Sequence, residues 1–212
     1  MRVGILGSGL MGAKLGTLFA RAGHEVVFSY ARREQKLKKL AKEAKARAGT
    51  PDEAAKNADA LLLAVHWSRF DDVLKQAGDL SGKVIVTCSL PMNDDDTGLV
   101  VAHTSSGAEE LAKRLPTSRV VSAFNTVPSE VLFDVFENRR KAARPSLVYC
   151  GDDLRAKRVA AQLIRHVGFD AVDAGPLWIA RYTEPFALLV ARLAYEGKSG
   201  PELAYRFERF GK

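Results

Sequence analysis

The sequence is poor in cysteine and contains no long apolar segment. Its two cysteines, Cys88 and Cys150, end separate apolar runs, a pattern typical of buried free thiols rather than of a disulfide framework or a metal site. No window reaches the roughly 18 uninterrupted apolar residues of a membrane-spanning helix, and the chain opens on a strand-like run without a signal-peptide layout. We therefore expect a cytoplasmic protein with no metal centre and no membrane segment.

Acidic residues are outnumbered: 32 lysines and arginines against 25 aspartates and glutamates give a formal net charge of +7. Such an excess suits an anionic partner, either nucleic acid or a phosphate-rich small molecule. Much of it falls in residues 32–47, where basic residues share helical spacing with Leu37 and Leu40. Because this pattern is typical of a solvated helix face, and no helix-turn-helix or zinc finger is present, we expect no nucleic-acid partner.

Short apolar runs alternate with segments of helical periodicity along most of the chain. This alternation predicts an α/β fold, namely a Rossmann-type doubly wound and mainly parallel sheet with C-terminal helices. The strands are predicted at residues 2–6, 25–29, 60–65, 83–88, 119–124, 146–150 and 170–173. The helices are predicted at residues 10–22, 34–46, 68–77, 106–115 and 154–167, and a short one follows the capping box at residues 50–53.

Two apolar-faced helices are predicted after the turn at Gly175 and Pro176. Pro185 is expected to interrupt or kink a helix that begins near residue 177. The whole chain is interpreted as one domain, in which residues 1–173 form the nucleotide-binding core and residues 174–212 pack on that core or on a dimer partner. The first helix carries Phe186, Leu189, Val190 and Leu193, and the second opens at Pro201 and carries Leu203, Tyr205, Phe207 and Phe210.

A glycine-rich turn follows the first predicted strand and opens the first predicted helix. Gly7 permits the tight turn, Gly9 lets a pyrophosphate approach the backbone, and Gly12 lets helix and strand pack closely. The free N–H groups of the helix then face the phosphates. The motif predicts a dinucleotide site, and its members are Gly7, Ser8, Gly9, Leu10, Met11 and Gly12.

The end of the second predicted strand lacks the acidic residue that an NAD-selective site places there. Ser29, Tyr30, Arg32 and Arg33 occupy this region instead. Arginine engages phosphate oxygens in a bidentate manner, and Tyr30 or an arginine can stack on adenine. We therefore predict NADP(H) rather than NAD(H), with Arg32 preferred to Arg33 as the contact to the 2′-phosphate.

Two more segments follow strands where open α/β sheets bind ligands. His66 can contact the nicotinamide or its ribose, and Asn125 with Thr126 can bind the nicotinamide amide or the second substrate; a loop histidine and a turn-forming asparagine are the alternatives. Residues 94–96 are three aspartates, interpreted as a solvated loop. The lack of an obvious acid–base pair suits hydride exchange between two cofactors better than reduction of a ketone or imine.

Taken in order, these motifs resemble the NADP-dependent oxidoreductases of the deazaflavin coenzyme F-420, and the N-terminal reductase domains of transmembrane metalloreductases are similar. The resemblance covers nearly the whole length. The matching segments are residues 7–12, 29–33, 64–67, 89–91, 121–128, 150–153 and 173–177.

The resemblance implies a homodimer and direct hydride transfer between C4 of the nicotinamide and C5 of the deazaflavin. It places no certain catalytic residue, but it makes His66 and Asn125 candidates for positioning the rings. It also implies cofactor contacts from Ala64, Val65, His66, Trp67, Ser89, Ala123, Phe124 and Asn125.

Asn125 departs from the archaeal deazaflavin enzymes, which carry histidine there, so a flavin (FMN or FAD) stays open as the hydride acceptor. Two other functions also stay open. One is an NADP-dependent reductase of a small carbonyl or imine, of the β-hydroxyacid dehydrogenase and pyrroline-carboxylate reductase type, which needs a proton donor on the C-terminal helices. The other is a non-catalytic NADP-binding regulator.

Overall fold

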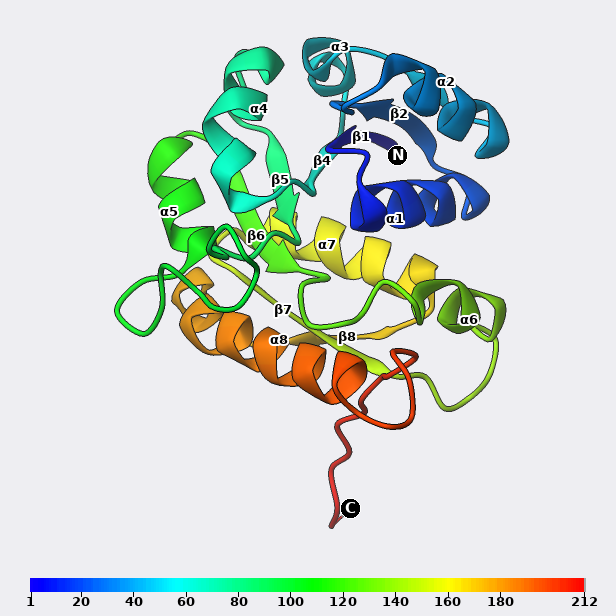
Figure 1. Cartoon of the computed structure of the whole chain (residues 1–212), viewed down its shortest axis with the longest axis vertical. Helices are drawn as coiled ribbons and strands as arrows, with labels where there is room; N and C mark the ends of the chain where they lie inside the picture. The colour runs from blue at the N-terminus through cyan, green and yellow to red at the C-terminus, as the bar shows by residue number, and fades with distance from the viewer. Residues whose placement is uncertain (212) are drawn as a thin grey trace.

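The computed structural model describes residues 1–211 and contains one eight-stranded sheet with helices on both faces (Figure 1). The strand order is β3-β2-β1-β4-β5-β6-β7-β8. Strands β1 to β6 are parallel, β7 runs antiparallel to β6, and β8 runs parallel to β7. The strands are β1 (Arg2–Leu6), β2 (Glu25–Ser29), β3 (Arg47–Ala48), β4 (Ala60–Leu63), β5 (Val84–Thr87), β6 (Arg119–Ala123), β7 (Ser146–Gly151) and β8 (Asp170–Asp173).

The first six strands have the order of a dinucleotide-binding doubly wound sheet, which confirms the predicted fold. Helices α1 (Leu10–Arg21), α6 (Leu132–Glu137) and α7 (Leu154–Val167) lie on one face, and α2 (Glu34–Glu43) adds its buried side chains to the same core. Helices α3 (Pro51–Lys56), α4 (Phe70–Ala77) and α5 (Gly107–Arg114) cover the other face (Figure 1). The remaining helical elements are two 3₁₀ turns, η1 (Trp67–Arg69) and η2 (Leu177–Ile179), and the last helix, α8 (Ala180–Tyr195).

The central strands are buried on both faces of the sheet. Leu62 packs in the core beneath α1 and α7, whereas its neighbours Leu61 and Leu63 pack in the core beneath α3, α4 and α5. Successive strand residues point to opposite faces, so a strand covered on both sides needs an unbroken apolar run. This explains why the runs at β4 and β5 were identifiable in the sequence.

The capping hydrogen bonds that the sequence predicts at the starts of α3 and α5 form to different extents. At α3, the Thr50 hydroxyl accepts a hydrogen bond from the Glu53 N–H at 3.2 Å, and the Glu53 carboxylate accepts from the Thr50 N–H at 2.8 Å, so the predicted capping box is confirmed. Residues 106–109 at the start of α5 also have the sequence pattern of a capping box, but only half of this box forms. Ser106 caps the Glu109 N–H at 3.2 Å, but the Glu109 carboxylate instead accepts from the Arg181 guanidinium at 2.7–3.2 Å.

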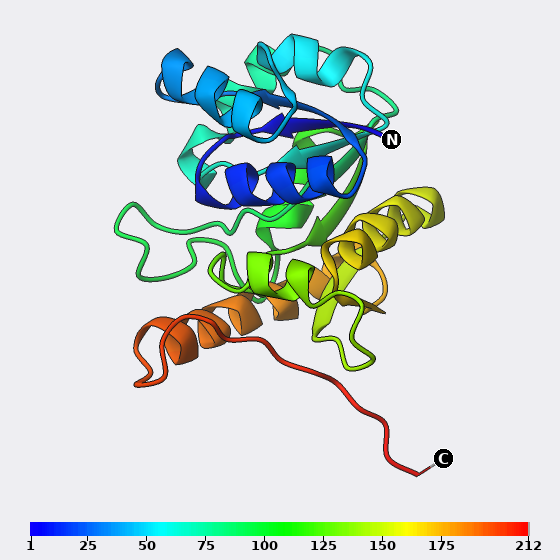
Figure 2. The same ribbon diagram turned by 90° about the vertical axis from the view of Figure 1, so that its right-hand side faces the viewer.

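The C-terminal region differs from the prediction in two respects. The helix continues through Pro185, and the irregular geometry falls earlier, in η2. The second predicted helix is wrong, because residues 202–211 have no helix. The Ser146 N–H donates to the carbonyl of Tyr205 at 2.8 Å, and the Tyr205 hydroxyl lies 2.7 Å from the Thr126 hydroxyl. The segment is held extended along β7 before its last residues leave the body (Figure 2).

Helix α8 is fixed to α5 by a buried carboxylate. Glu184 is 1% exposed, and its two carboxylate oxygens accept from the N–H groups of Gly107 at 2.8 Å and Ala108 at 3.0 Å. These donors are free at a helix N-terminus, and a carboxylate from another helix satisfies them. Burial raises the pKa of Glu184 to about 7, although the two N–H donors favour the charged form.

Glu184→Gln is expected to remove a pH dependence of stability. Because the folded pKa of about 7 lies above the ordinary value of 4.5, the folded state binds more protons between these values, and the free energy of unfolding falls as pH rises through them. The fall is at most about 3 kcal/mol. Urea denaturation at low and high pH across this window measures it.

The matched control is Glu137→Gln, which changes an exposed glutamate on α6 and should leave the pH profile of the wild type unchanged. Profiles of wild type and Glu184→Gln that run parallel across the window would contradict the assignment.

Candidate functional site

The glycine turn joins β1 to α1 at the carboxyl ends of the strands. Gly7 has a φ of +113°, and a Cβ at Gly12 would overlap the Gly7 carbonyl oxygen. A Cβ at Gly9, in contrast, would meet no atom within 4 Å. Ser8 ties the turn to β2, because its N–H donates to the Tyr30 carbonyl at 3.1 Å and its hydroxyl to the Ser29 carbonyl at 2.9 Å. Gly7 and Gly12 therefore shape the turn, and Gly9 leaves the space in front of α1 open.

The residues after β2 are divided between interior and solvent. Ser29 is fully buried and donates to the Ile5 carbonyl at 2.7 Å, so its hydroxyl does not face a ligand, which corrects the expectation of a phosphate contact. The Tyr30 hydroxyl hydrogen-bonds to Asp72 and accepts from Arg69 at 2.9 Å. Arg32 and Arg33 are exposed beyond the glycine turn.

The segment after β4 places His66 and Trp67 on different sides. The Ser68 N–H donates to Nδ1 of His66 at 3.2 Å, so the ring hydrogen is on Nε2, which lies 3.4 Å from Asp96. Trp67 is turned toward α4 and α5: its ring centroid lies 4.8 Å from that of Phe70 and 5.0 Å from the Arg114 guanidinium carbon. Trp67 is not among the residues that line the pocket described next, and its cofactor contact stays a prediction.

Asp96 reaches His66 from a long excursion between β5 and α5, which protrudes from the body of the molecule (Figure 2). Asn93 stabilises a turn within this excursion, because its side-chain oxygen accepts from the N–H groups of Thr97 at 2.9 Å and Gly98 at 3.0 Å. The aspartates of this excursion are exposed, as expected of a solvated loop.

A pocket of 280 Å³, called the crevice pocket below, opens beside the glycine turn. It joins the start of α1 to the ends of β4, β5 and β6, and α8 forms its far wall. The lining brings together six predicted residues, namely Leu10, Met11, Val65, His66, Phe124 and Asn125. It also contains Leu90, Met92, Val127 and Pro128, which lie in or directly beside the matching segments 89–91 and 121–128. The remaining lining residues were not predicted as ligand contacts, namely Cys88, Ser129, Ala187, Val190, Ala191 and Tyr195.

Several predicted contacts lie behind this lining. Ala64 packs against the glycine turn, and Ala123 is buried within the sheet. The Ser89 hydroxyl donates to the Val65 carbonyl at 2.7 Å, and Thr126 is buried against Tyr205. Thr126 is therefore a core residue rather than a ligand contact, whereas Asn125 lines the pocket and its amide donates to the Ser122 hydroxyl at 3.2 Å.

The wall contributed by α8 corrects the interpretation of this helix. Phe186, Leu189 and Leu193 were expected to mark a core or dimer face rather than a pocket wall. Leu189 is 53% and Leu193 is 58% exposed, so these two are not core residues, and the dimer face stays a prediction. The inward positions are small or β-branched instead, with Ala187 and Val190 in the lining. The sequence signal for this pocket wall was the presence of small residues three to four positions apart, because small side chains let another group approach the helix closely.

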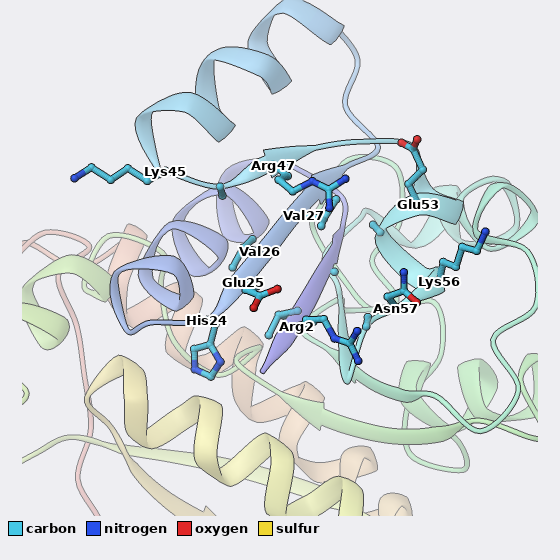
Figure 3. A pocket seen from close by; sticks show the side chains of 15 residues that line it. Arg2, His24, Glu25, Val26, Val27, Lys45, Arg47, Glu53, Lys56 and Asn57 are labelled. Carbon is cyan, nitrogen blue, oxygen red and sulfur yellow. The ribbon is translucent and has the colours of Figure 1, made fainter.

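A larger hollow of 420 Å³ lies elsewhere, at the amino ends of β1 and β2. Figure 3 shows Arg2, Glu25 and Arg47 around it, with Lys56 and Asn57 from the end of α3. Open α/β sheets bind nucleotides at the opposite edge, outside the carboxyl ends of the strands. We therefore assign the functional site to the crevice pocket.

Within residues 1–211, no group of three His, Cys, Asp or Glu side chains is arranged to hold a metal ion. Both cysteines are buried and unpaired, and burial raises the pKa of each thiol to about 12. None of the described helices has the length and apolar character to cross a membrane.

The strand order, the glycine turn and the crevice pocket define a dinucleotide-binding protein of the Rossmann type. Comparison with known proteins gives the family. Residues 2–91 match the family model described as NADP oxidoreductase, coenzyme F420-dependent. The F420-dependent NADP reductase of Methanocaldococcus jannaschii is 30% identical over 217 aligned residues, which cover 94% of this chain and 95% of that protein. The chain belongs to the family of F420-dependent NADP oxidoreductases.

Two further similarities extend this result. Metalloreductase STEAP3 of Rattus norvegicus is 29% identical over 88% of this chain, but the match spans only 36% of the metalloreductase. The crystal structure of a candidate F420-dependent NADP reductase from Arthrobacter has a TM-score of 0.86 at 23% identity and covers 99% of this chain and 100% of its own. The latter similarity shows a shared fold over the whole chain.

The second and third glycines of the turn, Gly9 and Gly12, predict opposite effects of alanine. Gly9→Ala fits the free protein and is expected to change stability by less than about 0.5 kcal/mol, yet to weaken NADPH binding at least about tenfold by blocking the pyrophosphate. Gly12→Ala meets the Gly7 carbonyl and should destabilise the fold by several kcal/mol, on the order of the overpacking cost. Thermal denaturation and NADPH titration separate the two, and Gly9→Ala with unchanged affinity would refute the assignment.

Proposed function

We propose that the protein transfers a hydride between NADP(H) and a deazaflavin, with a flavin as the alternative acceptor. The observation that carries this proposal is a largely apolar pocket that starts at the glycine turn and is closed by α8. Two cofactor rings can exchange a hydride with little help from side chains, provided that the protein orients them and excludes water. Family membership supports the same chemistry.

The pyrophosphate of NADP(H) is proposed to lie across the glycine turn, where α1 presents its first free N–H groups. Arg32 and Arg33 are proposed to bind the 2′-phosphate, since both are exposed beside the turn and β2 ends without an acidic residue. The Tyr30 ring is held by Asp72 and Arg69 and provides a flat surface near the adenine end. The Ser29 hydroxyl donates to the Ile5 carbonyl and so fixes the end of β2, which precedes these residues, to β1.

The nicotinamide and the acceptor are proposed to share the crevice pocket. Met11 and Val65 lie on the cofactor side, and Ala187, Val190 and Ala191 lie on the α8 side. His66 and Asn125 are the proposed ring-positioning residues. Each is itself positioned by a neighbour, His66 by Ser68 and Asn125 by Ser122.

Reduction of a small imine or carbonyl is the second candidate, because a phenol on α8, that of Tyr195, lines the pocket where such a reaction needs a proton donor. However, the Tyr195 hydroxyl donates its single hydrogen to the Glu130 carboxylate at 2.7 Å. Burial raises the pKa of Tyr195 to about 12. Both features oppose proton release into the pocket, so the two-ring reaction is favoured.

We also propose a homodimer. Tyr182, Leu189 and Leu193 share one face of α8 and are 63%, 53% and 58% exposed, and Trp178 extends the same apolar stripe. An exposed stripe of this kind is typical of a protein–protein interface. The two buried free thiols fit a reducing compartment, so we retain the cytoplasm as the proposed location.

The full-length protein is expected to oxidise NADPH when an oxidised 8-hydroxy-5-deazaflavin is added, with FMN and FAD as the alternative acceptors. NADH should support little turnover. Arg32→Ala should raise the KM for NADPH about tenfold or more, because a charge-assisted contact to phosphate is lost, and should leave the KM for NADH unchanged. Loss of the nicotinamide absorbance measures each rate.

The matched control is Arg155→Ala, which removes an exposed arginine from α7 and should change neither KM. Absence of NADPH oxidation with every one of these acceptors would reject the proposed reaction. Equal KM values for NADPH and NADH would reject the cofactor assignment alone.

Introducing charge into the stripe is expected to separate the dimer. Leu189→Glu with Leu193→Glu places two carboxylates on the proposed contact, where they would be desolvated without partners. In sedimentation experiments, the wild type should behave as a dimer and the double variant as a monomer. Leu154→Glu, on α7 at a residue that is 71% exposed, is the control and should stay dimeric. A monomeric wild type at micromolar concentration would disprove the dimer.

A further inference from the structure

At two places in the wall of the crevice pocket, a lining residue is hydrogen-bonded to a charged side chain behind it. Lys14 of α1 donates from Nζ to the carbonyl oxygen of Ser129 at 3.0 Å and to its hydroxyl at 3.2 Å. Tyr195, the last residue of α8, donates its hydroxyl hydrogen to Glu130 at 2.7 Å. Ser129 and Tyr195 line the pocket, whereas the two charged groups are not part of its lining. A cation is therefore bonded to the hydroxyl of one lining residue, and a carboxylate to the hydroxyl of the other.

The hydrogens of the two hydroxyls give them different roles. A phenol has one hydrogen, so Tyr195 offers the pocket only the lone pairs of its oxygen and acts as an acceptor. Its neutral form is retained, because burial raises its pKa to about 12. The Ser129 oxygen accepts from Lys14, and its own hydrogen is directed to the Glu130 carboxylate. A ligand carbonyl would have to draw this hydrogen away from Glu130.

We infer that Ser129 and Tyr195 recognise an amide edge, one C=O beside one N–H, on the ring of the acceptor. This inference rests on the proposed function and identifies the part of the acceptor that is read, namely the pyrimidinedione edge that deazaflavins and flavins share. The carbonyl accepts from Ser129, and the ring N–H donates to Tyr195. The other polar side chains of the lining, His66 and Asn125, already have neighbours at Ser68 and Ser122.

The charge behind each hydroxyl strengthens this match. The Glu130 carboxylate increases the electron density on the Tyr195 oxygen, and the Lys14 ammonium makes the Ser129 hydroxyl a better donor. During transfer, the C4–H bond of NADPH breaks and its electron pair forms a C–H bond on the acceptor ring. The nicotinamide is oxidised, and the reduced ring gains negative charge on its carbonyl and nitrogen atoms. A donor fixed at that carbonyl is favourable for this change.

A quinone would form fewer hydrogen bonds with Ser129 and Tyr195 than a ring with an amide edge. It carries carbonyl groups without an adjoining N–H, so the Tyr195 oxygen would face either an apolar atom or another acceptor. Tyr195 would keep its bond to Glu130 but would gain no hydrogen bond from the ring. The same pair therefore selects against quinones among planar hydride acceptors.

The test compares an 8-hydroxy-5-deazaflavin with its N3-methyl derivative, which keeps the ring and both carbonyls but lacks the N–H. Binding to the NADP⁺-saturated full-length protein is measured by quenching of deazaflavin fluorescence. We expect the wild type to bind the N–H ring about tenfold more tightly, as for one good hydrogen bond to a polarised acceptor. Tyr195→Phe should bind both rings equally.

Ser199→Ala is the control, because it removes a hydroxyl from an exposed residue just after the same helix and should keep the preference. The wild-type comparison of the two rings needs no variant, so a folding defect in Tyr195→Phe does not decide the result. Equal binding of the two rings by the wild type, or a preference that survives in Tyr195→Phe, would overturn the inference and leave the proposed function standing if NADPH oxidation persists. A protein that neither binds nor reduces the deazaflavin or a flavin would overturn both.

Discussion

The contact between the Glu184 carboxylate and the first N–H groups of α5 determines where α8 lies, and much of the site depends on α8. The contact satisfies two donors that would otherwise be buried without partners, and the Glu109–Arg181 ion pair lies beside it. One end of α8 is thereby fixed to a helix that packs on the sheet. The remaining turns extend across the carboxyl edge and close the crevice pocket, and Tyr195 at the far end reaches Glu130.

Most of the sheet could be predicted because its signals are local. The bounds of β1, β2, β8 and α7 match the sequence prediction, since alternating or unbroken apolar runs there agree with burial. Strand β3 was missed because two residues carry no periodicity. The extended C-terminal segment was taken for a helix, although Leu203, Tyr205 and Phe207 are spaced by two. Its conformation is decided by bonds to Ser146 and Thr126, which are distant in sequence.

The candidate site was predictable to the extent that one motif contains it. The glycine turn is continuous in sequence, so the positions of Gly7, Gly9 and Gly12 followed from spacing alone. Side-chain direction did not follow: the Ser29 and Thr126 hydroxyls belong to the interior. The polar residues Ser129 and Tyr195 of the pocket wall were not predicted, because they come from the segment after β6 and from α8. No local pattern links them or their partners Lys14 and Glu130, and only tertiary packing brings these groups together.

Helix α8 carries the pocket wall on one face and the exposed apolar stripe on another. Linkage between two sites is reciprocal. Whatever free energy the proposed self-association through the stripe adds to acceptor affinity is therefore returned in full as tighter self-association when the acceptor is bound.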